Sequence, residues 1–118
     1  MRALRLKSGT RNKYGAVRTV VDGIKLDSKA EARRYGELKL LERAHEIQGL
    51  KVHPMFDIWF PVRNDKILIC KVELDFSYFD KRDNCYHYED VKGKDNSLSK
   101  LKRKLVEAAY PIKVEIIK

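Results

Sequence analysis

The hydrophobic positions of this chain change their spacing along the sequence, and each spacing predicts a different element. In residues 14–28, β-branched runs flank Asp22-Gly23, a pair typical of two-residue turns, which predicts a β-hairpin. After Ser28, apolar residues recur at helical spacing, and Gly49 is a residue type that commonly ends a helix. We therefore expect a helix from Ser28 to about Gly49, with an apolar stripe formed by Ala30, Ala32, Tyr35, Leu38, Leu41, Ala44 and Ile47.

Shorter segments follow, and they predict a series of strands. The expected strands are LKV at 50–52, MFDIWFPV at 55–62, a long strand at about 66–79, and CYHYEDVKG at 85–93. A second helix is expected from about Ser99 to Ala109, and the strand IKVEII follows Pro111. The expected inward positions of this helix are Leu98, Leu101, Leu105 and Ala108. Three of these strands, taken with the two helices and the last strand, give the core order helix, three strands, helix, strand, which is typical of an α/β fold.

Two of the expected strands carry acidic residues that a hydrophobic core would not accept. Alternation places Glu73 and Asp75 on one face of the long strand, and Asp90 and Lys92 on one face of the next. If the connecting turn is residues 81–84, counting back puts Asp75 across from Asp90 and Glu73 across from Lys92. Opposed side chains lie ~5 Å apart, so we expect two carboxylates to be held close together.

Two carboxylates at that distance repel each other unless a positive charge lies between them. Lys92 is one source of that charge, and a divalent cation with oxygen ligands is another. The alternative is a ladder of charges on the solvent-exposed face of a sheet. The first helix packs on this sheet and is expected to bring Glu31 near, although Glu31 also follows Ser28 at the spacing of a capping box.

Composition and charge limit the classes of function. The chain has 118 residues, which we take as one domain, and a formal net charge of +9, which indicates nucleic acid as a partner. Five Arg and Lys residues without an acid make residues 1–13 a basic arm. The two cysteines form no CxxC motif, which is typical of a reducing, cytoplasmic location, and no segment resembles a signal peptide or a membrane span. The three histidines lack zinc-ligand spacing and are expected at surface or core positions.

Basic residues surround the start of the second helix. Cations at this end of a helix do not favour its dipole, so phosphate binding is one explanation and a solvated helix face is the other. The candidate DNA-binding residues here are Lys94, Lys100, Arg103 and Lys104. Arg33 and Arg34, which lie off the apolar stripe of the first helix, are further candidates.

With these motifs in place, the chain resembles the PD-(D/E)xK nuclease superfamily. The matching elements are Asp75 at the end of one strand, Asp90-Val91-Lys92 on its partner, and Glu31 on the first helix. The segments DGIKLDSKAEARRYGELKLLE, ELDFSYFD, YEDVKGK and LKRKLVEAAYPIKVEII together resemble a family of small phage-encoded nuclease-like proteins. That family is similar to the archaeal-type Holliday junction resolvases. One departure is that Leu74, rather than proline, precedes the strand acid.

The resemblance implies a restriction-endonuclease-like core with a mixed sheet, and a Mg²⁺-dependent DNA endonuclease in which Mn²⁺ can substitute. Such an enzyme hydrolyses phosphodiester bonds in branched DNA during recombination, as a homodimer that cuts four-way junctions. Carried over, Glu31, Asp75, Asp90 and the Val91 carbonyl would bind metal, and Lys92 would be the catalytic lysine; alternation favours Asp90 over the adjacent Glu89. The alternatives are a nickase or repair endonuclease on linear duplex, and a non-catalytic nucleic-acid-binding protein.

Overall fold

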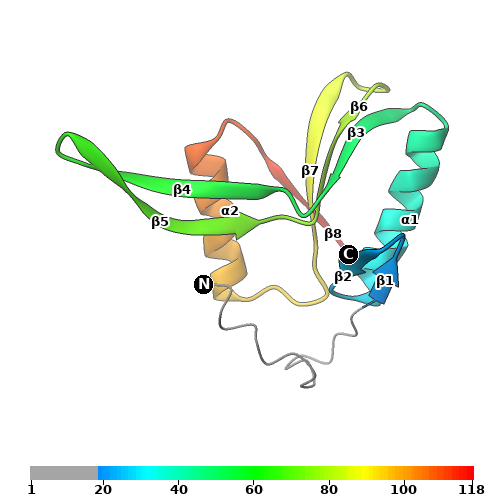
Figure 1. Cartoon of the computed structure of the whole chain (residues 1–118), viewed down its shortest axis with the longest axis horizontal. Helices are drawn as coiled ribbons and strands as arrows, with labels where there is room; N and C mark the ends of the chain where they lie inside the picture. The colour runs from blue at the N-terminus through cyan, green and yellow to red at the C-terminus, as the bar shows by residue number, and fades with distance from the viewer. Residues whose placement is uncertain (1–18) are drawn as a thin grey trace.

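A computed structural model describes residues 19–118, so the basic arm expected at residues 1–13 lies outside the described residues. The fold is mixed α/β, with two helices, a central sheet and an N-terminal β-hairpin (Figure 1). The elements are, in order, β1 (Thr19–Val21), β2 (Ile24–Leu26), α1 (Lys29–Arg43), β3 (Ile47–Val52), β4 (Met55–Val62), β5 (Asp65–Glu73), β6 (Phe76–Asp80), β7 (Cys85–Val91), α2 (Ser97–Ala109) and β8 (Val114–Ile117).

The predicted hairpin is confirmed at β1 and β2, and residues 14–18 of the prediction lie outside the described residues. Its turn has the backbone that two-residue turns need. Asp22 and Gly23 have φ angles of 53° and 76°, both in the left-handed region, and Val21 pairs with Ile24 on either side. Asp and Gly adopt this conformation at low cost. The hairpin leads directly into the N-cap of α1 and buries Leu26 beneath that helix.

Helix α1 is shorter than the apolar stripe predicts. It ends at Arg43 because His45, with φ 61°, takes the left-handed position that follows a helix. The His45 N–H donates to Glu42 O and the Glu46 N–H to Leu41 O, the hydrogen-bond pattern of a Schellman motif. The prediction that Gly49 ends the helix is therefore wrong, since Gly49 lies inside β3.

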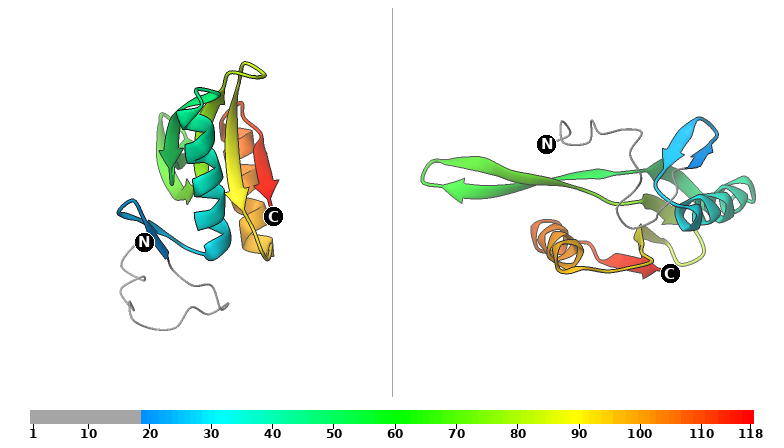
Figure 2. Two further views of the ribbon diagram at one scale, coloured as in Figure 1. Left: turned by 90° about the vertical axis from the view of Figure 1, so that its right-hand side faces the viewer. Right: turned by 90° about the horizontal axis from the view of Figure 1, so that it is seen from below.

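The central sheet has the strand order β3-β6-β7-β8. Its first three strands are antiparallel, while β7 and β8 are parallel and are connected by α2. Figure 2 shows α1 lying across one face of this sheet. The first core cluster lies between them and consists of Leu26, Tyr35, Leu38, Ile47, Phe76 and Tyr78. Along the chain, the central sheet and the two helices follow the order α1, β3, β6, β7, α2 and β8, and β4 and β5 lie between β3 and β6.

Strands β4 and β5 form a two-stranded ribbon that projects from the central sheet (Figure 1). We call residues 55–73 the ribbon. The pairing of β3 with β6 continues into it, because the His53 N–H donates to Asp75 O and the Leu74 N–H to Pro54 O. The long strand expected at 66–79 is therefore broken at residues 74–75. The ribbon bends away from the sheet here, beside His53 with φ 57° and Pro54.

Helix α2 begins two residues earlier than predicted, after the N-cap Asn96, and its expected inward face is partly wrong. Val106 is fully buried, Leu105 is partly buried, and Leu98, Leu101 and Ala108 are exposed. The reason is that α2 packs against the base of the ribbon. The second core cluster consists of Ile58, Val72, Leu74, Val106 and Val114. Neither helix of the described chain is long and apolar enough to cross a membrane.

Candidate functional site

A cleft of about 670 Å³ lies where the N-termini of α1 and α2 approach the bend of the ribbon. The N-cap residues of the two helices, Ser28 and Asn96, both line it. Helix N-termini carry unpaired N–H groups and a partial positive charge, which attract anions such as phosphate. The residues with chemical groups of interest in this cleft are Glu31, Asp75, Val91, Lys92, Lys94 and Asp95.

Glu31 is buried, and its two carboxylate oxygens have different partners. Oε1 accepts a hydrogen bond of 3.0 Å from the Asp27 N–H, and Oε2 lies 2.6 Å from His53 Nε2. The Ser28 hydroxyl caps the helix by accepting from the Glu31 N–H at 3.1 Å. Ser28 therefore caps α1 without a capping box, because the Glu31 side chain accepts from the Asp27 N–H and not from the Ser28 N–H. The other oxygen of Glu31 faces the ribbon bend.

Asp75 lies at the bend of the ribbon, one residue before β6. Its N–H donates to Glu89 O at 3.0 Å, and its Oδ2 accepts from the Val91 N–H at 2.6 Å. The predicted register is confirmed where Asp80 pairs with Cys85, and its continuation places Asp75 across from Asp90. Glu73 was expected across from Lys92, which is wrong: Glu73 pairs with Met55 because the chain has already turned into the ribbon.

His53 is the residue that sequence reasoning missed. Its φ of 57° is uncommon for a residue other than glycine, and it holds the side chain against Glu31 at the bend. Nitrogen and oxygen atoms of Glu31, His53 and Asp75 all lie within 4.8 Å of one another, so the three side chains could hold one metal ion. The only signal in the sequence is a histidine followed by proline between two strands, which does not reveal its proximity to Glu31.

Burial makes two negative charges costly in this group. The pKa of Asp75 is raised to about 8 by burial and by the nearby charge of Glu31, against the hydrogen bond from Val91. The pKa of Glu31 is also raised by burial, while its hydrogen bond to His53 opposes the rise. A cation bound between these carboxylates would supply the missing positive charge, so the donors fit a divalent metal.

Asp90 is buried beside Asp75, but its partners are cationic side chains. Its Oδ2 lies 3.5 Å from Lys92 Nζ and 3.6 Å from Arg103 Nη1. Arg103 also forms a bidentate ion pair with Asp95, with N–O distances of 2.5 and 2.9 Å. Lys92, one of the two expected sources of positive charge, therefore lies beside Asp90. Arg103, expected to bind DNA, is engaged with two acidic residues at the edge of the cleft.

The neighbouring acid, Glu89, is fully buried on the opposite face of β7, which faces α1. Both of its oxygens accept hydrogen bonds from Arg34, at 2.8 and 2.6 Å, and the Tyr78 hydroxyl donates to one of them. The hydrogen bonds to Glu89 raise the pKa of Arg34. Arg34 therefore joins α1 to the sheet and is not free for phosphate, whereas Arg33 is exposed.

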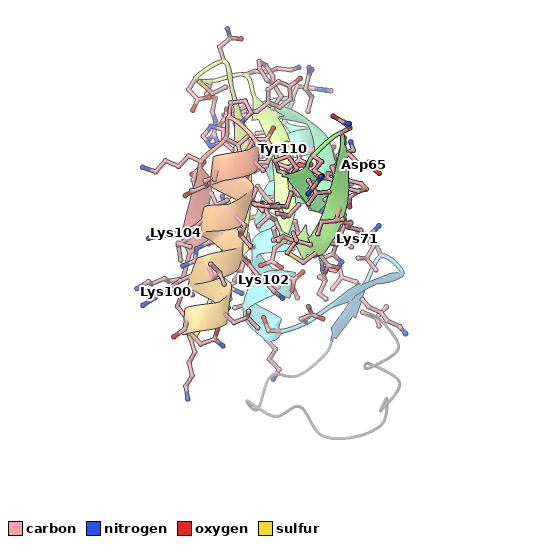
Figure 3. The ribbon with its side chains drawn as sticks, turned by 90° about the vertical axis from the view of Figure 1, so that its left-hand side faces the viewer. Asp65, Lys71, Lys100, Lys102, Lys104 and Tyr110 are labelled. Carbon is pink, nitrogen blue, oxygen red and sulfur yellow. The ribbon has the colours of Figure 1, made fainter. Side chains whose placement is uncertain are left out.

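Exposed lysines extend from the cleft along α2. Lys94 lines the cleft, and Lys100 and Lys104 project from α2 on the side away from the ribbon (Figure 3). No acidic residue lies in the first turn of this helix. The surface next to the cleft is therefore positively charged, as the basic run in the sequence predicts.

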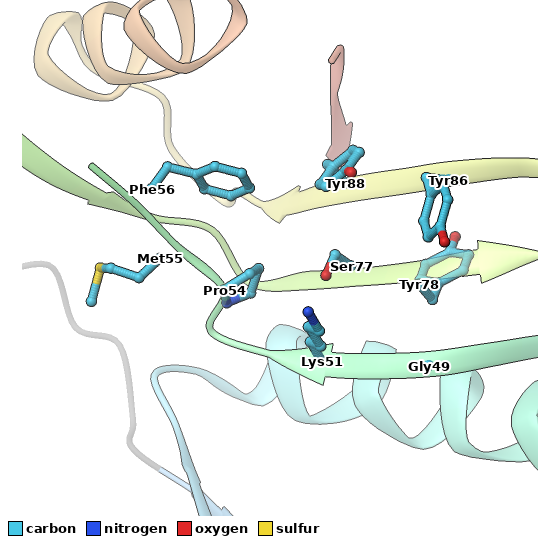
Figure 4. Close-up of a pocket in the computed structure, with 9 residues that line it drawn as sticks. All are labelled: Gly49, Lys51, Pro54, Met55, Phe56, Ser77, Tyr78, Tyr86 and Tyr88. Atoms are coloured by element: carbon cyan, nitrogen blue, oxygen red, sulfur yellow. The ribbon is translucent and has the colours of Figure 1, made fainter. Parts of the chain in front are cut away.

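A second hollow, of about 300 Å³, lies where the ribbon leaves the sheet (Figure 4). Met55, Phe56, Tyr86 and Tyr88 line it together with Lys51. Phe56 contacts Tyr88 edge to face, with ring centroids 6.0 Å apart. This hollow is mostly apolar and has none of the acidic residues of the cleft.

No curated protein and no solved structure matches the chain. A family described as "Protein of unknown function (DUF1064)" matches residues 11–118, which includes the cleft, both helices and the ribbon. The chain belongs to this DUF1064 family.

Proposed function

We propose that this protein is a metal-dependent endodeoxyribonuclease of the PD-(D/E)xK type. The observation that carries the proposal is the meeting of Glu31, Asp75 and Lys92, from three separate segments, in one cleft. A restriction-endonuclease-like core is supported by the order helix, three strands, helix, strand around the mixed sheet. In this assignment the ribbon is an insertion between the first two strands of that core.

Glu31, His53 and Asp75 would hold the metal, with Asp90 and the Val91 carbonyl as further ligands from the neighbouring strand. A bound divalent cation would lower the pKa of a water molecule and neutralise charge on the phosphate. Two carboxylates suit Mg²⁺, whereas an imidazole is more readily accepted by Mn²⁺ and other transition metals. The presence of His53 therefore favours Mn²⁺ over Mg²⁺ as the more tightly bound ion.

Lys92 would act on the substrate directly. Its ammonium group lines the cleft and lies near Asp90, so it is held at the side of the proposed metal ligands. In that position it would orient the attacking water or stabilise the charge that develops on the phosphate. The N-terminus of α2, Lys94 and the α2 lysines would bind the neighbouring phosphates of the DNA backbone.

Branched DNA, with four-way junctions as the main substrate, is proposed from the resemblance to junction resolvases. The test is cleavage of a four-way junction, a flap and a linear duplex of the same sequence, with Mg²⁺, with Mn²⁺ and with chelator. We expect metal-dependent cleavage that prefers the junction and is lost in Lys92→Ala. Lys25→Ala, which changes an exposed lysine on β2, is the matched control and should cleave normally.

A non-catalytic nucleic-acid-binding protein is the second candidate, because Arg103 and Lys92 already neutralise Asp90. Such a protein would bind the junction without cutting it under any metal condition, and Mn²⁺ would affect binding only as ionic strength does. Equal cleavage of all three DNA substrates would instead indicate a nickase or repair endonuclease on linear duplex.

A further inference from the structure

The outer part of the ribbon exposes large apolar side chains. Between 41% and 57% of the surface of each is exposed, and they are Trp59, Phe60, Ile67, Leu68 and Ile69. The views in Figure 1 and Figure 2 both show the ribbon extending beyond the central sheet. A two-stranded ribbon is at best marginally stable in water, so a projecting one with apolar side chains requires a partner surface.

The exposed apolar side chains lie on both faces of the ribbon. Near its base, Ile58 and Val72 pack with Val106 of α2. Farther out, Trp59 pairs with Leu68 and Phe60 pairs with Ile67. Because neighbouring residues of a strand point to opposite faces, each of these two pairs occupies its own face. Among residues 19–118, helix α2 covers only the base of the ribbon and leaves both faces of its outer part exposed.

The charge of the ribbon identifies the kind of partner. Its charged residues balance, with Asp57, Asp65 and Glu73 against Arg63, Lys66 and Lys71. The ribbon is therefore formally neutral in a chain whose net charge is +9. A neutral, apolar surface is not suited to DNA or to an anionic membrane, since both bind through positive charge. It is suited to a copy of itself, because two such ribbons do not repel each other.

The exposed area is close to what a dimer needs. With ~200 Å² for a large apolar side chain, the exposed parts of the five residues sum to roughly 500 Å². An interface of standard size buries roughly 800 Å² on each partner, of which about 60% is apolar. The ribbon alone supplies that apolar share, and Met55, which is also exposed, lies at its base (Figure 4).

We propose that two copies of this chain associate through their ribbons across a two-fold axis, with Trp59, Phe60, Ile67, Leu68 and Ile69 in the interface. The same patch on both copies is the usual arrangement in a two-fold dimer. Lys100 and Lys104 of α2 project on the side away from the ribbon and remain exposed in this arrangement (Figure 3). The inference does not depend on nuclease activity, because it concerns a surface outside the acidic cleft.

The test is the mass of the full chain in solution without DNA, measured by sedimentation over a range of concentrations. The wild type should sediment as a dimer, with twice the chain mass of 13.8 kDa. Ile67→Glu should sediment as a monomer, so its measured mass should be half that of the wild type. Leu40→Glu on α1 is the control, because Leu40 is also exposed, at 63%, but lies outside the ribbon. This control should remain dimeric. Circular dichroism shows whether each variant is folded.

Trp59 provides a second measurement that needs no substitution. It is the one tryptophan of the chain, so its fluorescence reports on the ribbon. Diluting the wild type should shift the emission to longer wavelength as the interface opens. The proposal would be overturned if the wild type had the mass of one chain and its emission did not change on dilution. It would also be overturned if Ile67→Glu were folded and dimeric, or if Leu40→Glu lost the dimer. Emission that shifts only when junction DNA or anionic vesicles are added would assign the ribbon to that partner instead.

Discussion

At the scale of single residues, Glu31 has two roles: it accepts a backbone hydrogen bond at the start of α1 and belongs to a candidate metal site. One oxygen accepts from the backbone just before α1, and the other faces His53. The capping-box spacing in the sequence correctly predicts Ser28 as the cap. It does not reveal His53, because that contact depends on a left-handed backbone at a bend 22 residues farther along the chain.

The raised pKa of Asp75 predicts how the stability of the metal-free protein depends on pH. The pKa is about 8 in the folded state against an ordinary value of 3.8, so the folded state binds more protons between these values. Stability should therefore fall as the pH rises from about 4 to 8. Asp75→Asn does not titrate and still accepts from the Val91 N–H. It should be more stable than the wild type by ~1–3 kcal/mol at pH 8 and by little at pH 4.

Urea unfolding in chelator at the two pH values measures this difference. Glu46→Gln, at a half-exposed loop position after α1, is the control and should show no such trend. A variant that is less stable than the wild type at pH 8 would show that Asp75 is paired with positive charge in the folded state, contrary to this account.

His53 should decide which metal binds more tightly. His53→Asn keeps a residue type that tolerates the left-handed backbone but removes the imidazole. We expect Mn²⁺ affinity to fall by about tenfold or more, and Mg²⁺ affinity to change less. Calorimetric titration with each ion measures both. His45→Asn is a matched control, because His45 also has a positive φ but does not belong to the group of Glu31, His53 and Asp75. Equal losses in both variants would exclude His53 as a ligand.

At the scale of elements, local patterns predicted most strands and misplaced the points where the chain bends. The hairpin turn, the 81–84 turn and β4 were predicted well, because each depends on neighbouring residues. The break at residues 74–75 lies within a stretch of alternating apolar and polar residues that carries no turn signal, and it faces the bend of the partner strand at Pro54. The inward face of α2 was misassigned for a similar reason, since it packs on the ribbon rather than on the sheet alone.

Two neighbouring arginines of α1 differ in their contacts, because Arg34 links the helix to the sheet and Arg33 is exposed. Arg34→Ala would leave Glu89 buried without its ion-pair partner, and we expect a loss of about 3 kcal/mol or more. Arg33→Ala removes an exposed side chain and should leave stability within about 0.5 kcal/mol. Thermal unfolding of the two variants gives the comparison. Adding Glu89→Leu to Arg34→Ala should recover part of the loss, and no recovery would show that Arg34 stabilises α1 through other contacts.

At the scale of the whole molecule, charge is divided between the neutral ribbon and a basic remainder, in which α2 carries four Lys and Arg residues against one acid. This division separates two surfaces, one proposed to bind a second copy and one proposed to bind DNA. Two copies joined at their ribbons would carry two clefts, which suits the two-fold symmetry of a four-way junction. The predicted homodimer and the predicted DNA contacts would therefore be compatible on one molecule.

The salt dependence of DNA binding tests this division. Each phosphate contact contributes about 0.9 to the slope of log affinity against log salt. The double variant Lys100→Gln/Lys104→Gln should reduce the slope by about 1 to 2, measured by fluorescence anisotropy on junction DNA in chelator so that no cleavage occurs. Lys66→Gln/Lys71→Gln removes the same charge from the ribbon and should leave the slope unchanged. If the ribbon variant reduced the slope as much as the α2 variant, DNA would contact both surfaces and the proposed division would be wrong.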